Sequence, residues 1–184
     1  MLIADFYVAD AVRLLARGAY RRVSEDERGG VEVFREGDEL DFRLITEIRP
    51  EPWYAVVTLR DTVRFKAERP DAAGRLRTES RNSNGNDIRG GITVGYIVTD
   101  NWLIEFSVEG RHVLENDYPD GDALHDGGRT KVAFGPSITW TPTRRFAIDA
   151  GVRGFVLDVK QSPTFPREGT IYGVHADLRL TYRF

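Results

Sequence analysis

The chain has no cysteine and only one methionine among its 184 residues. Without thiols it can form neither a disulfide nor a thiolate zinc site, and it has no cysteine nucleophile. No stretch approaches the roughly 18 consecutive apolar residues of a membrane-spanning helix, and the mean hydropathy is −0.39. These absences exclude a helical membrane protein and a disulfide-stapled secreted domain.

A strong excess of one charge sign is also missing. Lys and Arg number 26 against 29 Asp and Glu, which gives a formal net charge of −3. There is no overall basic surface of the kind that binds nucleic acid, so no nucleic-acid partner is expected. The segment Met1–Asp5 has neither a basic region nor a long apolar run, and no signal peptide is recognised in it. Charged residues still make up 30% of the chain, so their placement needs an explanation.

A period of two dominates the residues that are present, most clearly in the last stretch, Ile171–Phe184. One set of alternate residues is apolar or aromatic: Tyr172, Val174, Ala176, Leu178, Leu180, Tyr182 and Phe184. The other set is mostly polar: Ile171, Gly173, His175, Asp177, Arg179, Thr181 and Arg183. This alternation predicts a β-strand with one apolar and one polar side. Its length suits a tilted transmembrane strand of about 9 to 11 residues better than a globular strand of about five or six.

Similar alternation predicts about eight strands in one domain that spans residues 1–184. They cover approximately residues 11–23, 40–48, 53–66, 88–98, 102–112, 131–140, 146–156 and 171–184. Residues 1–10 have no clear period, and we interpret them as an N-terminal extension.

The connections between these strands alternate in length. Short turns are expected at 49–52, 99–101 and 142–145, and long polar loops at about 24–39, 68–86, 115–129 and 160–170. Val31 and Val33 indicate a hairpin inside the first of these loops. In an antiparallel meander, strict alternation places all short turns on one rim, and an even strand count places both termini there as well. An aromatic girdle is predicted near that rim, formed by Trp53, Trp102, Trp140, Phe146, Tyr182 and Phe184, while Tyr20, Phe65 and Tyr172 fall nearer the other rim.

The final strand, which ends Leu-Thr-Tyr-Arg-Phe, resembles the closing strand of Gram-negative outer-membrane β-barrels. The segment Gly135–Gly154 is also similar to the C-terminal end of larger, transporter-like barrels. The resemblance implies an all-β, antiparallel, up-and-down transmembrane β-barrel with short periplasmic turns and long extracellular loops. It further implies a location in the bacterial outer membrane, contact with lipid and lipopolysaccharide, and recognition of the last strand by the outer-membrane assembly machinery. The expected role is non-enzymatic: structural, or a porin-like narrow channel for transport.

In a membrane barrel the polar faces line the lumen, and they carry roughly twice as many Arg and Lys as Asp and Glu. The predicted lumen charge network comprises Arg43, Glu47, Arg60, Arg64, Glu105, Glu109, Arg111, Asp149, Arg153, Asp177 and Arg179. Its arginines are expected to meet its carboxylates across neighbouring strands. Because an eight-stranded barrel has an interior just wide enough for side chains, an ion-paired structural core is favoured over an open anion-preferring pore.

Two other classes of protein give comparable patterns. A soluble, lipocalin-like barrel that binds an apolar ligand shows the same alternation with its apolar side chains inside. The terminal Phe184, the tryptophans at strand ends and the unequal loops favour the membrane barrel. A lipid-acting barrel enzyme is the third class, since barrel deacylases use a His/Ser pair and omptin proteases use Asp/His pairs. Here Ser107 and His112 fall on opposite faces and Ser137 has no evident base, so no catalytic residue is predicted.

Two loop segments are candidate binding sites. The segment Asn116–Asp122, with His125 and Asp126, is acidic enough for calcium but matches no EF-hand spacing, so no metal or cofactor is predicted. The segment Glu68–Arg89 carries arginines that could meet lipopolysaccharide phosphates, although a solvated loop is favoured. These arginines are Arg75, Arg77, Arg81 and Arg89.

Overall fold

The computed structural model describes residues 1–22, 26–28, 31–34, 37–70, 75–78, 85–118, 125–160 and 167–182. Its strands are β1 Leu2–Ala9, β2 Val12–Arg21, β3 Asp26–Arg28, β4 Val31–Phe34, β5 Glu39–Ile48, β6 Trp53–Arg64, β7 Glu68–Pro70, β8 Leu76–Thr78, β9 Asp87–Thr99, β10 Trp102–Val113, β11 Arg129–Thr143, β12 Phe146–Val159 and β13 Gly169–Tyr182. No helix in this described part of the chain is long and apolar enough to cross a membrane.

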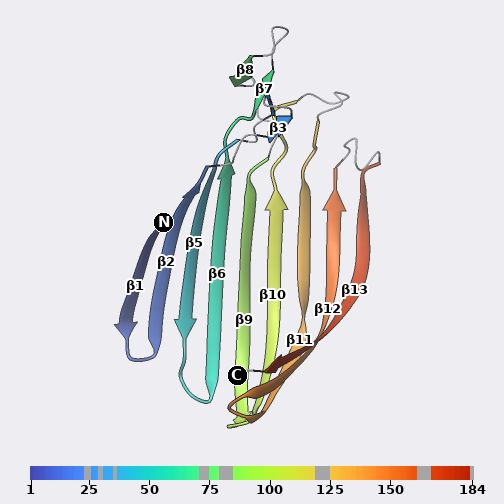
Figure 1. Cartoon of the computed structure of the whole chain (residues 1–184). Helices are drawn as coiled ribbons and strands as arrows, with labels where there is room; N and C mark the ends of the chain where they lie inside the picture. Colours follow the sequence, from blue (N-terminus) through green and yellow to red (C-terminus); the bar gives the residue numbers. More distant parts are fainter. Residues whose placement is uncertain are drawn as a thin grey trace.

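Nine of the strands form one sheet in the order β1-β2-β5-β6-β9-β10-β11-β12-β13, and every neighbouring pair is antiparallel (Figure 1). The prediction of an all-β, antiparallel, up-and-down fold is therefore confirmed. Within the described residues, β1 and β13 each pair with a single neighbour, so the sheet is open. The prediction of about eight strands, an even number, is wrong because the main sheet contains nine.

The additional strand is β1, which lies in the segment that the sequence pattern leaves without a period. It pairs with β2 through a short turn at residues 10–11, with Leu2 opposite Gly18. Because nine strands alternate in direction, β1 begins near the long-loop rim, whereas β13 ends near the short-turn rim (Figure 1). The expectation that both termini share the short-turn rim is therefore wrong.

The alternation of short and long connections is confirmed. Short turns join the strands at 10–11, 49–52, 100–101 and 144–145. The β3–β4 hairpin lies between β2 and β5, where Val31 and Val33 predicted one, and a second small hairpin, β7–β8, lies between β6 and β9. Both hairpins extend beyond the long-loop rim (Figure 1).

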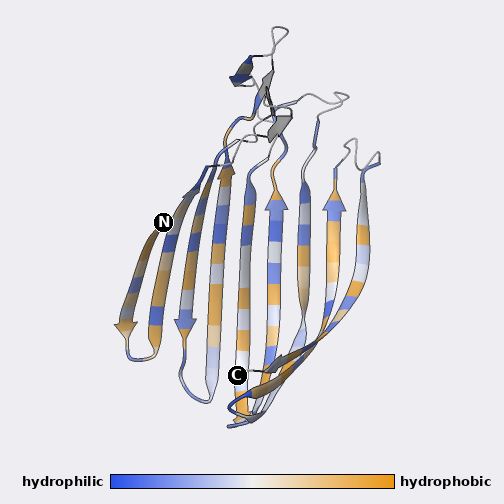
Figure 2. Ribbon diagram, viewed as in Figure 1, coloured by the Kyte–Doolittle hydropathy of each residue, from blue (hydrophilic) through white to orange (hydrophobic). Residues whose placement is uncertain are grey.

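The strand register separates the sheet into one apolar and one polar face. Val57 is opposite Ile92, which in turn is opposite Val108 on the next strand. The same holds for Phe134 and across the remaining strands. We call a row of register partners on the same face of the sheet a level, and at most levels of this face apolar residues lie beside apolar residues. Figure 2 shows this alternation as changes of hydropathy along each strand. We call these two sides the apolar face and the polar face.

The apolar face is not covered by any other part of the described chain. Phe106 is 49% exposed, Trp53 53% and Val174 75%. Only Ala67, Val113 and Val159 are buried among the described hydrophobic residues. The total accessible surface is 12683 Å², against roughly 9,000 Å² for a compact soluble monomer of this mass. The described residues therefore do not form an internal hydrophobic core of the kind that a soluble domain has.

Of the buried polar residues in the described part of the chain, Ser107 lies in the middle of β10, and the others lie at the long-loop rim. Polar Thr62, Asp87, Asn116 and His125 are enclosed there. Backbone hydrogen bonds join one loop to another, as from Phe65 N–H to the Asp38 carbonyl, 2.9 Å. The ends of the strands are thereby fixed relative to one another on the side where the polar face carries most of its arginines.

Candidate functional site

The polar face is concave. A hollow of about 480 Å³ lies on it, and its lining extends from Arg43 on β5 to His175 on β13. On a flat sheet those two strands would lie roughly 29 Å apart, so the sheet must curve for both side chains to line one hollow. Two contacts pass over an intervening strand: Tyr54 donates a hydrogen bond to Glu105 across β9, and Arg153 meets Glu109 across β11 at 3.1 Å. The charged side chains therefore converge rather than spread into solvent.

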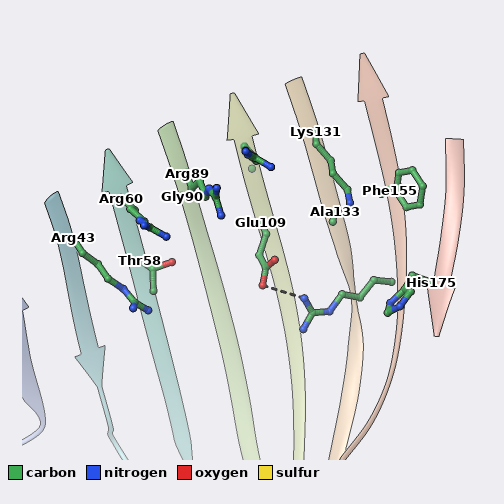
Figure 3. A pocket seen from close by; sticks show the side chains of 13 residues that line it. Arg43, Thr58, Arg60, Arg89, Gly90, Glu109, Lys131, Ala133, Phe155 and His175 are labelled. Atoms are coloured by element: carbon green, nitrogen blue, oxygen red, sulfur yellow. Dashed lines mark hydrogen bonds and ion pairs between the residues drawn. The ribbon is translucent and has the colours of Figure 1, made fainter. Parts of the chain in front are cut away.

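Cations dominate the lining of this hollow, as Figure 3 shows. The cationic residues are Arg43, Arg60, Arg89, Arg111, Lys131 and Arg153, and the other prominent side chains are Thr58, Glu109, Phe155 and His175. In Figure 3 the labelled side chains project from their strands toward the same side.

Most of these cations belong to a single cross-strand row. Arg17, Arg43, Arg60, Arg89, Arg111 and Lys131 are consecutive register partners on six adjacent strands, β2, β5, β6, β9, β10 and β11. We call these six residues the cation row. Like charges directly opposite one another destabilise a sheet. A row of this length therefore requires anions to offset it.

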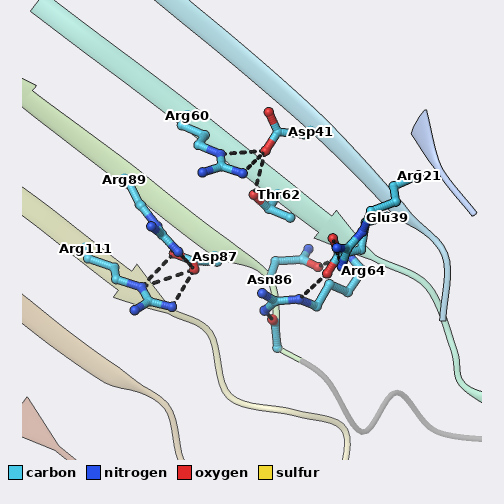
Figure 4. Close-up of polar contacts among 11 residues, drawn as sticks. Arg21, Glu39, Asp41, Arg60, Thr62, Arg64, Asn86, Asp87, Arg89 and Arg111 are labelled. Atoms are coloured by element: carbon cyan, nitrogen blue, oxygen red, sulfur yellow. Dashed lines mark hydrogen bonds and ion pairs between the residues drawn. The ribbon is translucent and has the colours of Figure 1, made fainter. Parts of the chain in front are cut away.

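Two aspartates, one level closer to the long loops, offset part of the charge (Figure 4). Asp41 accepts hydrogen bonds from Arg60 and from Thr62. Asp87 is completely buried and forms ion pairs at 2.6 Å with both Arg89 and Arg111.

The remaining members of the row have no such partner. Arg17, Arg43 and Lys131 are exposed, and none of them forms an ion pair with a carboxylate in the described ranges. The Lys131 ammonium instead lies over the Phe155 ring, 4.7 Å from its centroid. The row therefore divides into three guanidiniums held by aspartate and three exposed cations without an acidic partner.

All eleven residues of the predicted lumen charge network lie on the polar face, as their register pairs place them. Their pairing differs from the predicted one. The Arg153–Glu109 contact joins two predicted members. Arg60 and Arg111 bind aspartates outside the predicted set, Asp41 and Asp87.

The other members of the network also find different partners. Glu47 lies 2.9 Å from Arg49 and 3.6 Å from Arg13. Arg64 binds Glu39 at 3.1 Å. Asp149 accepts a hydrogen bond from Thr139 at 2.7 Å, and Asp177 lies 3.9 Å from His175 Nδ1. Arg179, like Arg43, has no ion pair with a carboxylate that the structure describes.

Sequence reasoning missed the row itself. Arg17, Asp41, Asp87, Arg89 and Lys131 were not grouped with the network, although each lies on the same face. One signal was accessible: Arg89 and Arg111 lie at nearly equal distances from the two-residue turn at 100–101, so a regular hairpin brings them opposite each other. Arg43 and Arg60 likewise face each other across the short turn at 49–52. The other three links cross long loops, which do not fix the register.

The predicted aromatic girdle lies on the apolar face toward the short-turn rim, with Phe184 outside the described residues. Trp53 contacts Tyr96 with ring centroids 4.7 Å apart, and Trp102 stacks on Trp140 at 5.6 Å. Phe146 is opposite Tyr182 on the last two strands. Toward the other rim, Tyr20, Phe65 and Tyr172 are exposed.

On β6 and from β10 to β13, polar residues limit the apolar face on the long-loop side. Asp61, His112, Thr130, Asp158 and Thr170 occupy one level of this face, which holds Ile88 on β9 and Phe42, Gly18 and Leu2 on β5, β2 and β1. Trp102 and His112 are ten steps apart along β10, which at about 3.4 Å per residue is roughly 34 Å. At the tilt of about 40° usual in membrane barrels, the apolar band would be roughly 26 Å tall.

The candidate catalytic residues do not come together. Ser107 lies on the polar face, whereas His112 lies on the apolar face and shares a 2.7 Å hydrogen bond with Thr130. In the acidic loop, His125 Nδ1 donates to the Tyr118 carbonyl at 2.7 Å, and residues 119–124 lie outside the described part.

The loop segments add no metal site to the described residues. Within the described ranges no group of three His, Asp or Glu side chains could hold a metal ion. Of the arginines weighed against lipopolysaccharide phosphates, Arg81 lies outside the described residues. Arg89 belongs to β9 and points into the hollow.

Comparison of the chain with protein-family models, with curated proteins and with solved structures finds no match to any of them.

Proposed function

We propose that the chain forms the wall of an outer-membrane β-barrel, a non-enzymatic protein whose basic lumen acts as a narrow, anion-preferring channel. One observation carries this proposal. The apolar face extends over nine strands without cover, whereas the charged face curves around a hollow. From strand spacing and band height, the apolar face measures on the order of 1,000 Å². Soluble monomers rarely expose apolar patches larger than a few hundred Å².

The dimensions of the apolar face fit a bilayer. Its estimated height of roughly 26 Å agrees with the band of about 25 Å in outer-membrane barrels. Trp53, Trp102 and Trp140 lie at one boundary, where indole rings favour the headgroup region. A soluble carrier of an apolar ligand needs the opposite arrangement, with apolar side chains around the hollow and arginines in water.

A barrel requires the two free edges to pair. Unpaired backbone N–H and C=O groups are not tolerated in hydrocarbon, and β1 and β13 each leave one edge without a partner among the described residues. Since the ninth strand runs in the same direction as the first, we propose that β1 and β13 close the barrel by parallel pairing. Barrels with an odd number of strands are known in mitochondria.

The orientation follows from the resemblance of the last strand to outer-membrane proteins. The long-loop rim would face the cell exterior and contact lipopolysaccharide, and the short turns would lie in the periplasm. The closing strand, β13, would be the element that the assembly machinery of that membrane recognises.

The preference for anions follows from the cation row. Its six cations face two aspartates, so the lumen carries a local excess of positive charge at this level. Low-dielectric walls concentrate such a field and raise the local concentration of counter-ions.

Extraction tests the membrane assignment. The protein should require detergent to leave the membrane fraction, and unheated samples should migrate differently from boiled samples on a denaturing gel. A protein that remains monomeric in aqueous buffer without detergent would contradict the assignment and favour the soluble carrier.

Conductance across a planar bilayer tests the channel. In a KCl gradient, the reversal potential should correspond to chloride passing more readily than potassium. The variant Arg43→Glu should reduce this preference because it places a carboxylate among the exposed cations, whereas Arg179→Glu, near the short-turn end of β13, should change it less. Absence of current at all voltages would contradict the channel role and leave a structural one.

A further inference from the structure

The three exposed members of the cation row, Arg17, Arg43 and Lys131, have a feature that a purely structural ion-pair network does not explain. Arg17 and Arg43 are direct register partners on β2 and β5, both are exposed, and neither meets a described carboxylate. Two guanidiniums held side by side repel each other. If the row served only to stabilise the sheet, a neutral residue at either position would stabilise it more.

The aspartates, in turn, hold the other three members of the row, Arg60, Arg89 and Arg111, in place. Asp87 receives Arg89 and Arg111 together, and Asp41 receives Arg60. Even so, the side chains of Arg60, Arg89 and Arg111 remain about two-fifths exposed, at 43%, 43% and 41%. A guanidinium has five N–H donors, so each of these arginines keeps further donors after binding its carboxylate, and all three line the hollow.

The row also lies at the entrance of the hollow. On β6, β10 and β11 it stands next to the level where Asp61, His112 and Thr130 end the apolar face on the long-loop side. A solute that enters past the long loops would pass the two aspartates and then meet these cations before it reaches the rest of the hollow, where Glu109 and Ala133 lie. At a strand spacing of about 4.8 Å, the six residues cover roughly 24 Å of the curved wall.

We propose that the cation row is a binding site for a small anion that carries two or more phosphoryl groups. This inference rests on the proposed function, because it assigns a ligand class to the same lumen. Each phosphoryl group offers three acceptor oxygens in a tetrahedral arrangement, which guanidiniums from different strands can share. Planar carboxylates are already supplied within the row by Asp41, which accepts from Arg60, and by Asp87, which accepts from both Arg89 and Arg111. Arg17, Arg43 and Lys131 provide the charge that the aspartates leave uncompensated, and the adjoining Glu109–Arg153 pair adds little net charge.

Calorimetric titration of the detergent-solubilised full chain with sodium tripolyphosphate tests the site. We expect saturable binding that weakens as NaCl is raised, since surface charge attraction is screened by salt. Arg43→Gln should weaken the affinity about tenfold or more, because each charge-assisted hydrogen bond lost costs at least that factor. Arg17→Gln should do the same, and Arg43→Lys should retain part of the affinity by keeping the charge.

The matched control is Arg179→Gln. Arg179 lies on the same polar face without a described acidic partner, but four levels nearer the short-turn rim than the row. Its replacement should leave the tripolyphosphate affinity within about twofold of the wild type. Far-UV circular dichroism and the heat-dependent gel shift should be unchanged in all variants, which keeps loss of fold separate from loss of the site.

Three results would overturn the inference: no tripolyphosphate binding, equal loss in Arg179→Gln and Arg43→Gln, or citrate binding as tightly as tripolyphosphate. The last result would mean that the site recognises multivalent charge rather than phosphoryl groups. Because the titration is carried out in detergent, its outcome is separable from the membrane assignment. A protein that binds tripolyphosphate but never inserts into a bilayer would refute the channel and retain the site.

Discussion

Tyr54 on β6 and Glu105 on β10 are joined by a hydrogen bond that passes over β9, and the residue between them is Gly95. The Tyr54 ring occupies the space above this glycine, so that a Cβ at position 95 would lie 2.1 Å from ring atom Cε1. The pairing of an aromatic ring with a cross-strand glycine is a recognised way of fixing register and curvature in a sheet. Here it also holds a carboxylate on the polar face.

Replacing Gly95 with alanine should therefore displace the Tyr54 ring and weaken its bond to Glu105. We expect a loss of about 1–3 kcal/mol in the free energy of unfolding, the usual cost of overpacking, measured by urea titration of the protein folded in detergent or lipid vesicles. The control is Gly90→Ala on the same strand, where the nearest atom to the new Cβ would be 3.6 Å away. Equal stabilities of the two variants would contradict this role of Gly95.

Replacing Asp87 with asparagine should destabilise the long-loop end of the sheet. The change removes the buried negative charge shared by Arg89 and Arg111, which then repel each other at a register-paired position. We expect a loss of about 2 kcal/mol, below the 3–5 kcal/mol of a fully buried pair because both guanidiniums remain partly in solvent. Asp158→Asn is the control, because Asp158 is exposed and hydrogen-bonds to Thr170, so it should change stability by less than about 0.5 kcal/mol.

Much of the fold follows from residue alternation. Segments such as Trp53–Arg64 and Phe146–Val159 have a clear period of two, which identifies both the strand and its apolar side. β1 could not be identified in this way because Ile3, Phe6 and Tyr7 place apolar and aromatic residues on both sides of the strand. That single strand changes the count from even to odd and moves the N-terminus to the opposite rim.

The candidate site was harder to predict from the sequence than the fold. Within a hairpin a short turn fixes the register, so the facing of Arg89 and Arg111, or of Arg43 and Arg60, could have been predicted. Across a long loop no such constraint exists. Three links of the cation row, Arg17–Arg43, Arg60–Arg89 and Arg111–Lys131, are of this kind. The row of like charges is therefore evident only when the six strands from β2 to β11 are aligned in register.

The orientation of the two faces can be tested with a pair of arginine substitutions on β11. Phe134 lies on the apolar face, 47% exposed and opposite Val108 near the middle of the band, and its replacement by arginine places a charge where acyl chains are proposed. The expected cost is about 2–4 kcal/mol for folding into lipid vesicles. Ala133→Arg is the matched control, because Ala133 lines the hollow directly opposite Glu109 and its replacement should cost less than about 1 kcal/mol. Improved solubility of Phe134→Arg without loss of folding in detergent-free buffer would instead indicate a soluble protein.

The closure of the sheet can be tested by disulfide formation, which the lack of native cysteine makes specific. Cysteine at Ala4 on β1 would be combined, one at a time, with cysteine at Val174, Ala176 or Leu178 on β13, all on the apolar face. If β1 and β13 pair within one chain, one of the three combinations should oxidise to an intramolecular disulfide in detergent, since paired strands bring Cβ atoms to about 4.5–5.5 Å. Three positions on β13 are needed because the sequences of the two strands do not fix the register in which β1 and β13 would pair.

The control for closure combines Ala4→Cys with Val108→Cys on β10, which has partners on both sides and should stay reduced. Covalent dimers in place of the intramolecular product would mean that the edges pair between copies, so that the barrel is assembled from more than one chain. No disulfide with any of the three β13 positions would contradict closure of this sheet. The membrane assignment would then require another partner for both edges, because hydrocarbon leaves no hydrogen-bond donors or acceptors for an unpaired strand.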